Sequence, residues 1–230
     1  MSEQRITEGD VLFEDNHLIA INKKAGVLVQ GDKTGDTSLT DSLSIFLKKK
    51  YDKPGNVFTG LIHRIDRPVS GLVLFAKTSK ALSRMNIIFQ KREVEKTYLA
   101  IVEGKVMDKK GHLVSFLTKN VKQNKSYASR AEKEGSKKAE LRWECLQYMD
   151  HYSVLKVIPL TGRHHQIRVQ LSGMGHPIKG DLKYGSKRSN SDASICLHAW
   201  KLNFVHPVQK TAVSITAQPP RVDVWNFIGF

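Results

Sequence analysis

Apolar residues along the chain fall into short runs that predict more strands than helices. Residues 11–13 and 18–21 are two such runs, and Asp15 and Asn16 between them are typical of a turn. Six further runs predict strands at 71–77, 95–104, 139–147, 152–160, 194–207 and 211–217. Because these runs do not alternate regularly with helical segments, the pattern favours an α+β fold with a largely antiparallel mixed sheet, not a βαβ series.

Two segments show apolar residues at helical spacing instead. In 37–51 the apolar positions between Leu39 and Leu47 share one face, and Thr37 or Ser38 can cap the start. In 79–92 a second apolar face follows Ser79, which we expect to be the N-cap. The sequence therefore predicts two helices in the first half of the chain.

Composition adds a strong positive charge to this picture. The chain has 230 residues, with 37 Lys and Arg against 22 Asp and Glu, a formal net charge of +15. Such a balance points to a polyanionic partner, either nucleic acid or an anionic membrane surface, although a generally basic surface would give the same count. The N-terminus lacks an apolar signal core, and no apolar run approaches the roughly 20 residues of a membrane span. With only Cys145 and Cys196, far apart in sequence, we expect a cytoplasmic protein with neither disulfides nor a zinc site.

Much of the positive charge lies in a segment that is almost free of apolar residues. We expect an exposed loop or hairpin over residues 105–138, and the part from 119 to 140 is the polar, charged one. The cations that form this basic stretch are Lys119, Lys122, Lys125, Arg130, Lys133, Lys137 and Lys138. We interpret this basic stretch as a grip for a phosphate backbone, with a merely solvated charged loop as the alternative.

A single carboxylate stands between two arginines in residues 61–71, LIHRIDRPVSG. The positive charge of Arg64 and Arg67 favours the ionised form of Asp66. A permanently charged carboxylate suits a nucleophile or a base, whereas a hard metal ion prefers clustered oxygen ligands. The segment alone also fits a salt-bridged turn aspartate, because structural ion pairs create similar surroundings.

A second candidate lies in 161–185, where Gly162 and Gly173 delimit a short helix. Residues 164, 167, 168 and 171 would share one of its faces and place His164 and Arg168 among apolar neighbours. A buried arginine is costly unless a carboxylate or phosphate meets it, and we expect Asp66 to be that partner.

Four segments, in this order, resemble the RluA-type RNA pseudouridine synthases. They are EDNHLIAINKKAGVLVQGD, HRIDRPVSGLVLFAKTSKAL, EKTYLAIVEG and GRHHQIRVQLSGMGHPIKGDLKYG. The resemblance implies a pseudouridine synthase fold with a sheet in two halves around a central basic cleft, and no cofactor or metal. The chain departs from the family pattern at Lys24 (usually Pro), Val69 (Thr), His164 (Thr) and Gln170 (His).

The resemblance also implies an activity, the isomerisation of uridines in tRNA, large-subunit rRNA or both. Asp66 would be the nucleophile, Tyr98 would stack on the uracil and help remove its C5 proton, and Arg168 would pair with Asp66. Arg64 would fill the gap left by the flipped base, since chemistry on a stacked base requires extrusion. Further substrate contacts would come from His63, Arg67, Arg163, His165, Ile167 and Leu171.

Residues 1–230 would then form one catalytic domain, without an accessory RNA-binding domain in front, and the protein would act as a monomer. Three alternatives compete with this interpretation. A non-catalytic RNA-binding module would bind RNA whether or not Asp66 is intact. A metal-dependent nuclease would need several neighbouring carboxylates, but the sequence has arginines around Asp66 instead. A membrane-surface protein would need a basic amphipathic helix, and the sequence shows none of the required kind.

Overall fold

The computed structural model describes residues 4–32 and 34–229, and this part of the chain forms two compact units. Unit 1 holds the chain up to Glu95 together with Ala199–Pro219. Unit 2 holds Lys96–His198 and the segment from Pro220 onward. Two of the three divisions fall inside strands, at the first residue of β5 (Glu95–Glu103) and within β10 (Leu197–Val205).

Unit 1 is built on strands in the order β1, β2, β4, β10, with β3 added to β4 and β11 added to β10. Their bounds are β1 Val11–Glu14, β2 Leu18–Lys23, β3 Gly60–Leu61, β4 Ser70–Ala76 and β11 Ala212–Thr216. The pairs β1–β2, β2–β4, β3–β4 and β10–β11 are all antiparallel. β4 is buried along its whole length, which explains why its sequence reads as an unbroken apolar run.

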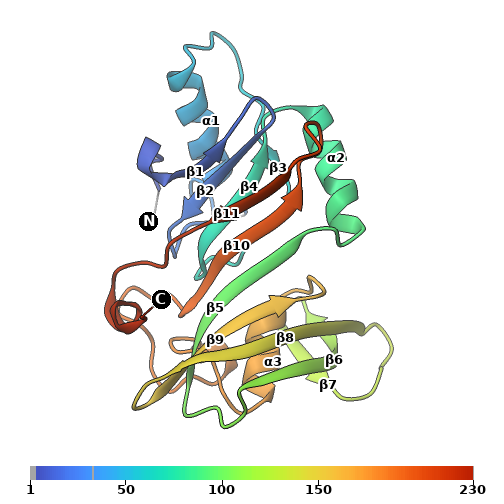
Figure 1. Ribbon diagram of the computed structural model, residues 1–230, viewed down its shortest axis with the longest axis vertical. Coiled ribbons are helices and arrows are strands. Elements are labelled where there is room, and N and C mark those ends of the chain that lie inside the picture. The colour runs from blue at the N-terminus through green and yellow to red at the C-terminus, as the bar shows by residue number, and fades with distance from the viewer. Residues whose placement is uncertain (1–3, 33, 230) are drawn as a thin grey trace. The chain divides into compact units, whose positions relative to one another are not determined.

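The two expected helices of unit 1 are present as α1 (Leu39–Lys50) and α2 (Ser79–Gln90) (Figure 1). Ser38 caps α1 as predicted, in a capping box with Asp41. The cap of α2 is Thr78 and not Ser79, because the Thr78 hydroxyl accepts the N–H of Ala81. The apolar side of α2 packs into a core cluster with β2, β4, β10 and β11.

Unit 2 contains five strands in the order β5, β9, β8, β6, β7, and each neighbouring pair is antiparallel. The remaining bounds are β6 Lys110–Asn120, β7 Lys125–Ser129, β8 Lys137–Tyr148 and β9 Tyr152–Pro159. The third helix, α3 (Gln166–Gly173), packs on this sheet, where Val169 meets Leu117 of β6 and Ala139 of β8. Short 3-10 helices lie at Glu8–Asp10, Leu182–Tyr184 and Asp223–Phe227.

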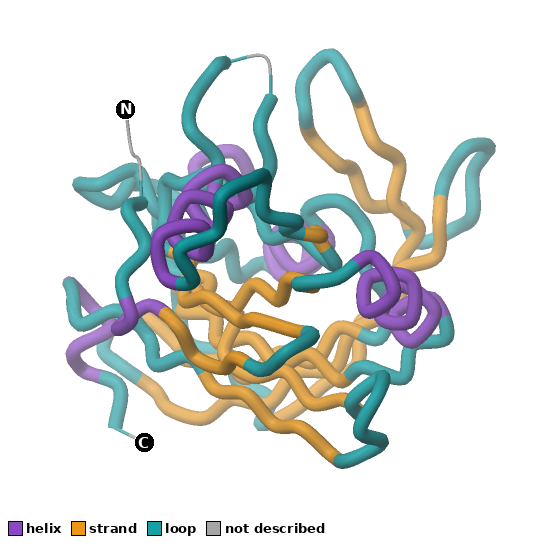
Figure 2. Tube along the Cα trace, turned by 90° about the horizontal axis from the view of Figure 1, so that it is seen from above, coloured by secondary structure: helices purple, strands orange, loops and turns teal. Residues whose placement is uncertain are grey.

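Strands dominate the regular structure, as the apolar pattern predicted (Figure 2). The expected α+β class with antiparallel pairing is confirmed. Residues 105–138 contain the β6–β7 hairpin, the second of the two predicted forms. Most of the hairpin is exposed or half-buried, whereas Leu117 and Ser126 are buried where it packs against α3.

Gly71 shows how closely the strands of unit 1 approach one another beside Asp66. It has φ +111°, and a Cβ atom there would lie 2.3 Å from the carbonyl oxygen of Ala199 on β10. Only glycine permits both this conformation and this approach. The loop that carries Asp66 therefore enters β4 at a fixed point against β10.

In the described parts of the chain, no helix combines the length and the apolar character that crossing a bilayer would require.

Candidate active site

Asp66 lies half-buried in the loop between β3 and β4. Its carbonyl oxygen accepts the N–H of Val69 over 3.0 Å, which closes a turn around Pro68. β3 pairs with β4, so the strand before the loop and the strand after it are joined to each other. The carboxylate is therefore presented on a loop whose two ends are held by the sheet.

Arg67 ties this loop to the segment that follows β2. Its Nε donates to the carbonyl oxygen of Gly26 over 2.9 Å, and its Nη2 lies 2.7 Å from Oδ2 of Asp36. In return the N–H of Gly26 donates to the carbonyl oxygen of Arg67 over 2.8 Å. Sequence reasoning proposed Arg67 as a substrate contact, and the structure gives its guanidinium these partners within the protein.

A buried lysine completes the support of the loop. Lys23 is only 1% exposed, and its Nζ donates to the carbonyl oxygens of Lys24, Val27 and Arg67 at 2.8–3.1 Å. Burial lowers the pKa of Lys23 to about 7, although the negative charge of nearby Asp66 partly opposes the shift. Sequence reasoning missed this residue. Its one signal was a cation at the end of a buried apolar strand.

Arg64 and His63 precede Asp66 and face different surroundings. Arg64 is exposed, and its Nη1 donates to Oε1 of Gln30 over 3.3 Å. The Nε2 of His63 accepts the backbone N–H of Leu74, and its ring stacks on Phe89 of α2 with centroids 5.3 Å apart. Arg64 is thus available to a ligand in solution, whereas the described contacts of His63 bind it to β4 and α2.

Tyr98 lies in unit 2, on β5, opposite Val157 of β9. Its neighbours Thr97 and Leu99 are buried, while Tyr98 itself is half-buried. The next residues of the strand, from Leu99 to Val102, are all buried. The pairing of β5 with β9 therefore holds the backbone of Tyr98 in the sheet, and its side chain stays partly exposed.

Arg168 lies on α3 and is almost fully buried. Because an isolated buried charge is costly, a buried arginine needs a partner of opposite charge. Its Nε lies 2.7 Å from Oδ2 of Asp181, and its Nη2 lies 2.8 Å from Oδ1 of the same carboxylate. Asp181 is also buried. Sequence reasoning missed this partner, although Asp181 stands in the Gly-Asp pair of the fourth matched segment. The pairing of Arg168 with Asp66 stays a prediction.

The expected helical face around Arg168 was wrong in one respect. α3 begins at Gln166, so His164 precedes the helix and does not share a face with Ile167 and Leu171. The cause is His165, which adopts the left-handed conformation at φ +55° and ends any helical path before Gln166. Leu171 and Ile167 are both buried, as their apolar character predicts.

The histidines before α3 instead join the helix to the β6–β7 hairpin. The rings of His164 and His165 stack with centroids 3.7 Å apart. His164 contacts Ser126 of β7, with Nδ1 2.9 Å from Oγ, and its own carbonyl oxygen accepts the Ser126 hydroxyl. Arg163 lies beside them, and its Nε donates to the carbonyl oxygen of Lys138 on β8. Arg163, His165, Ile167, Arg168 and Leu171 thus gather in unit 2.

Across the described ranges, no group of three or more His, Cys, Asp or Glu side chains is placed to hold a metal ion. The candidate residues instead offer one carboxylate among cations in unit 1, and an arginine with its carboxylate in unit 2. Such groups supply a nucleophile and electrostatic stabilisation.

A sequence profile described as RNA pseudouridylate synthase matches residues 17–173. The chain belongs to this family. The matched range begins before β2 and ends with α3, so it includes Asp66, Tyr98 and Arg168. The RluA-type resemblance seen in the sequence is confirmed, and with it membership of a family of RNA-modifying isomerases.

Several named members of the family are similar over most of the chain. The tRNA pseudouridine synthase C of Haemophilus influenzae is 33% identical, over 90% of this chain and 92% of that protein. The ribosomal large subunit pseudouridine synthase C of Buchnera aphidicola is 31% identical, over 95% of this chain and 69% of that protein. The human RNA pseudouridylate synthase domain containing 4 shares the fold, with a TM-score of 0.78 at 24% identity, and the match covers 93% of this chain and 89% of that one.

Proposed function

We propose that this pseudouridine synthase isomerises uridines in tRNA, in large-subunit ribosomal RNA, or in both, with Asp66 as the nucleophile. The observation that carries the proposal is the loop of Asp66. It presents one half-buried carboxylate between Arg64 and Arg67, and the sheet, Lys23 and Asp36 support its backbone and neighbours. The similar proteins named for tRNA and for large-subunit ribosomal RNA supply the two substrate classes.

The reaction needs neither an oxidant nor a cofactor, because pseudouridine is an isomer of uridine. Asp66 attacks the ribose C1′ or the uracil C6, and the bond between C1′ and N1 breaks. The uracil turns and C5 bonds to C1′, and the bond between Asp66 and the nucleotide breaks, which regenerates the carboxylate; C5 then loses its proton and N1 gains one. The Asp66 carboxylate supplies the attacking oxygen in the first step.

The other proposed roles belong to residues in both units. Tyr98 stacks on the uracil and assists in removing the C5 proton. Arg168 pairs with Asp66, and Arg64, which is exposed and ends in a planar guanidinium, takes the place of the flipped base. His63, Arg67, Arg163, His165, Ile167 and Leu171 complete the proposed substrate site.

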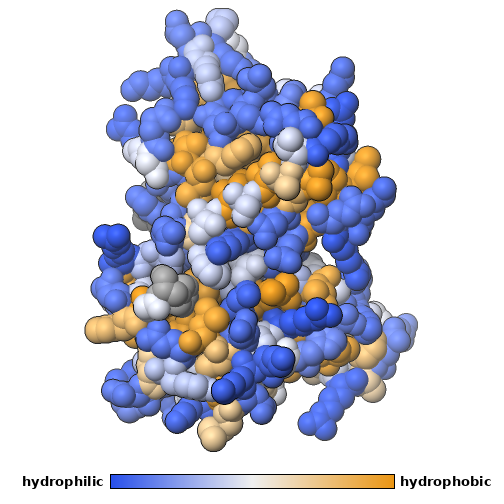
Figure 3. All heavy atoms as spheres, viewed as in Figure 1, coloured by the Kyte–Doolittle hydropathy of each residue, from blue (hydrophilic) through white to orange (hydrophobic). Residues whose placement is uncertain are grey.

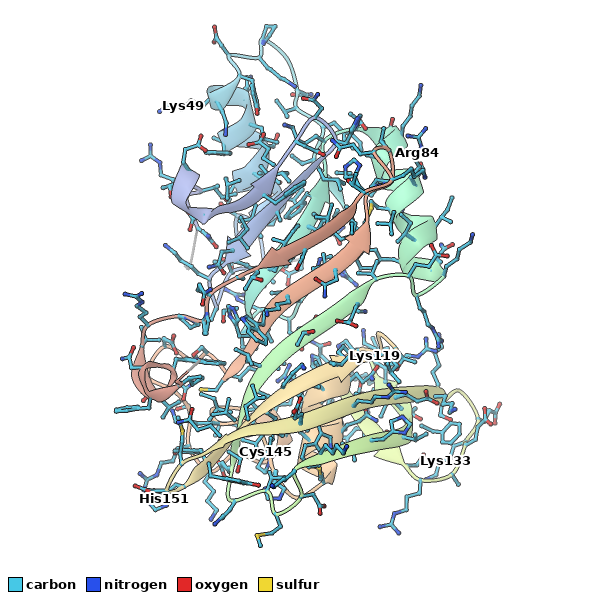
Figure 4. The ribbon with its side chains drawn as sticks, in the orientation of Figure 1. Lys49, Arg84, Lys119, Lys133, Cys145 and His151 are labelled. Atoms are coloured by element: carbon cyan, nitrogen blue, oxygen red, sulfur yellow. The ribbon has the colours of Figure 1, made fainter. Side chains whose placement is uncertain are left out.

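The basic stretch is proposed to bind the RNA backbone beyond the reacting nucleotide. Its residues come from the β6–β7 hairpin, the loop that follows β7 and the start of β8, and six of the seven cations are exposed. Figure 4 labels Lys119 on β6 and Lys133 in the loop that leads to β8, and the surface over this part of unit 2 is largely hydrophilic (Figures 3 and 4). We further propose that the protein acts as a monomer in the cytoplasm, where its RNA substrates are made or matured.

The test uses bulk tRNA and ribosomal RNA transcripts that carry tritium at uracil C5. Wild-type protein should release tritium from at least one RNA, and Asp66→Asn should release none above background. Asp150→Asn is the matched control, because Asp150 is an exposed carboxylate in a turn of unit 2. If the wild type and Asp66→Asn both bound RNA but neither released tritium, the proposed isomerase would be refuted and an RNA-binding module favoured.

A further inference from the structure

Asp181 holds Arg168 in a two-point ion pair inside unit 2. The carboxylate takes Nε–H and one hydrogen of Nη2, at 2.7 and 2.8 Å. A carboxylate that meets two nitrogens of one guanidinium fixes the plane of that group as well as its position. The other three N–H bonds of Arg168 consequently point in directions that Asp181 sets.

Tyr184 fixes the same guanidinium from one face. The Cζ of Arg168 lies 5.1 Å from the centre of the Tyr184 ring, within the range of a cation–π contact. The ring is itself anchored, because its hydroxyl accepts the N–H of Ser126 over 2.8 Å and lies 2.9 Å from Nδ1 of His165. Tyr184 is 5% exposed, so this anchoring is shielded from water.

The pair of Asp181 and Arg168 is not needed simply to fill the interior of unit 2, whereas the Tyr184 ring also belongs to the core cluster of Leu117, Ala139 and Val169. A buried ion pair contributes little net stability, and apolar side chains of similar volume often replace one without loss. What such a pair does supply is a defined orientation. Arg168 receives two independent constraints, one in its plane from Asp181 and one across its face from Tyr184.

We propose that Asp181 and Tyr184 are positioning residues, which orient the guanidinium of Arg168 for the isomerisation of uridine. This rests on the proposed function, in which Arg168 pairs with the nucleophile. A guanidinium that turned away by a fraction of an ångström would still bind RNA electrostatically but would stabilise the reacting carboxylate less well.

The first experiment compares single-turnover rates of pseudouridine formation in wild-type protein and Asp181→Asn. The variant should react about tenfold to a hundredfold more slowly, while its Kd for the same RNA changes less than about threefold. The control is Asp223→Asn, which removes a carboxylate paired with Lys179 elsewhere in unit 2 and should keep the wild-type rate. An unchanged rate in a folded Asp181→Asn protein would overturn the proposal.

A double-mutant cycle separates positioning from a general structural effect. If Asp181 acts through Arg168, then Asp181→Asn should slow the reaction far less in an Arg168→Lys background, because the guanidinium it orients is already gone. Equal slowing in both backgrounds would show that Asp181 does not act through Arg168.

Asp181→Asn removes a charge from a buried pair and can fail to fold, so Tyr184→Leu is the second variant. It keeps the ion pair and removes the stacked ring, and we expect a severalfold slower reaction with RNA affinity preserved. A folded Tyr184→Leu protein with the wild-type rate would overturn the role of the ring.

An NMR measurement tests the orientation without any reaction. In wild-type protein the Nε–H proton of Arg168 should exchange slowly with water, and Tyr184→Leu or a folded Asp181→Asn should accelerate exchange at least tenfold. If the wild type modified no RNA, the proposed function would fail, and slow exchange would still support the fixed guanidinium. Fast exchange in the wild type would overturn the positioning proposal whatever the activity.

Discussion

The guanidinium of Arg67 and the carboxylate of Asp36 lie 2.7 Å apart, and Arg67 directly follows Asp66. Asp36→Asn should therefore disturb the loop that presents Asp66. We expect the rate of pseudouridine formation to fall about tenfold, because small displacements of a nucleophile are costly. Stability should change by less than about 1 kcal/mol, since the pair is partly exposed.

That prediction is checked by single-turnover kinetics and denaturant unfolding of the same protein. The control is Asp32→Asn. Asp32 lies with Asp36 in the segment between β2 and α1, its carboxylate contacts Thr34, and its replacement should leave the rate unaltered. A wild-type rate in Asp36→Asn would show that Gly26 and Lys23 hold the loop without Asp36.

Lys23 should make the stability of the protein depend on pH. Its ordinary pKa is 10.5 and burial lowers it to about 7, so between these values the unfolded chain binds more protons than the folded one. The free energy of unfolding should consequently rise from about pH 7 to pH 10.5, by at most roughly 5 kcal/mol from this group. Below pH 7 the cost of burying the charge is present in full.

The measurement is urea unfolding of wild type and Lys23→Met between pH 6.5 and 10. The difference in unfolding free energy between the two proteins should increase with pH in favour of the wild type. Lys24→Met, which changes the exposed side chain next in sequence, should run parallel to the wild type. If the unfolding free energies of Lys23→Met and the wild type changed with pH in parallel, the lowered pKa of Lys23 would be contradicted.

The departure from the family at Lys24 has a partner in the N-terminal segment. A proline has no N–H, whereas the N–H of Lys24 donates to Oε1 of Gln4 over 2.8 Å. Gln4 is 2% exposed and also donates to the carbonyl oxygen of Asn22. Lys24→Pro should therefore destabilise this protein by about 1–3 kcal/mol, although proline is usual in the family, because a buried oxygen loses its donor.

Chemical denaturation of four proteins tests this coupling: wild type, Lys24→Pro, Gln4→Ala and the double variant. In the Gln4→Ala background the proline should cost clearly less, since no buried oxygen then loses a donor. Additive losses would mean that proline is disfavoured by the local backbone and not by Gln4.

The basic stretch should set the salt dependence of RNA binding. Replacing Lys119, Lys122, Lys133 and Lys137 with Gln should weaken binding and flatten the slope of log Kd against log salt concentration, because fewer phosphate counterions are released. A control that replaces Lys80, Lys91, Lys105 and Lys110, all exposed, should alter the slope less. Equal slopes for the two fourfold variants would remove the hairpin from the RNA-binding surface.

The sequence was most informative where one local rule decided the outcome. Apolar runs located most of the strands, although not β3, β6 and β7, and helical spacing with a serine cap located α1. Ordered motifs identified the family, and the charge around Asp66 marked a candidate nucleophile. Each of these signals is contained within a few neighbouring residues.

The misses concern contacts between distant parts of the chain. Asp181 reaches Arg168 only because the segment after α3 folds back, which no local pattern reports. Lys23 becomes a support for the loop of Asp66 because it lies at the end of β2 and reaches the carbonyl oxygen of Arg67, and His165, with its positive φ, contacts Tyr184, 19 residues further along the chain. For His164, the spacing rule extended the predicted helix through His165, whose backbone is left-handed in the structure.

The attachment of the β6–β7 hairpin has a consequence for how this protein can diversify. Ser126 and His164 join β7 to the start of α3, whereas residues 121–123 at the turn are exposed and lie outside that junction. The turn can therefore gain, lose or exchange residues while the junction stays intact. Unit 2 thus combines a turn whose length and sequence can vary with a junction whose residues are held by contacts to the start of α3.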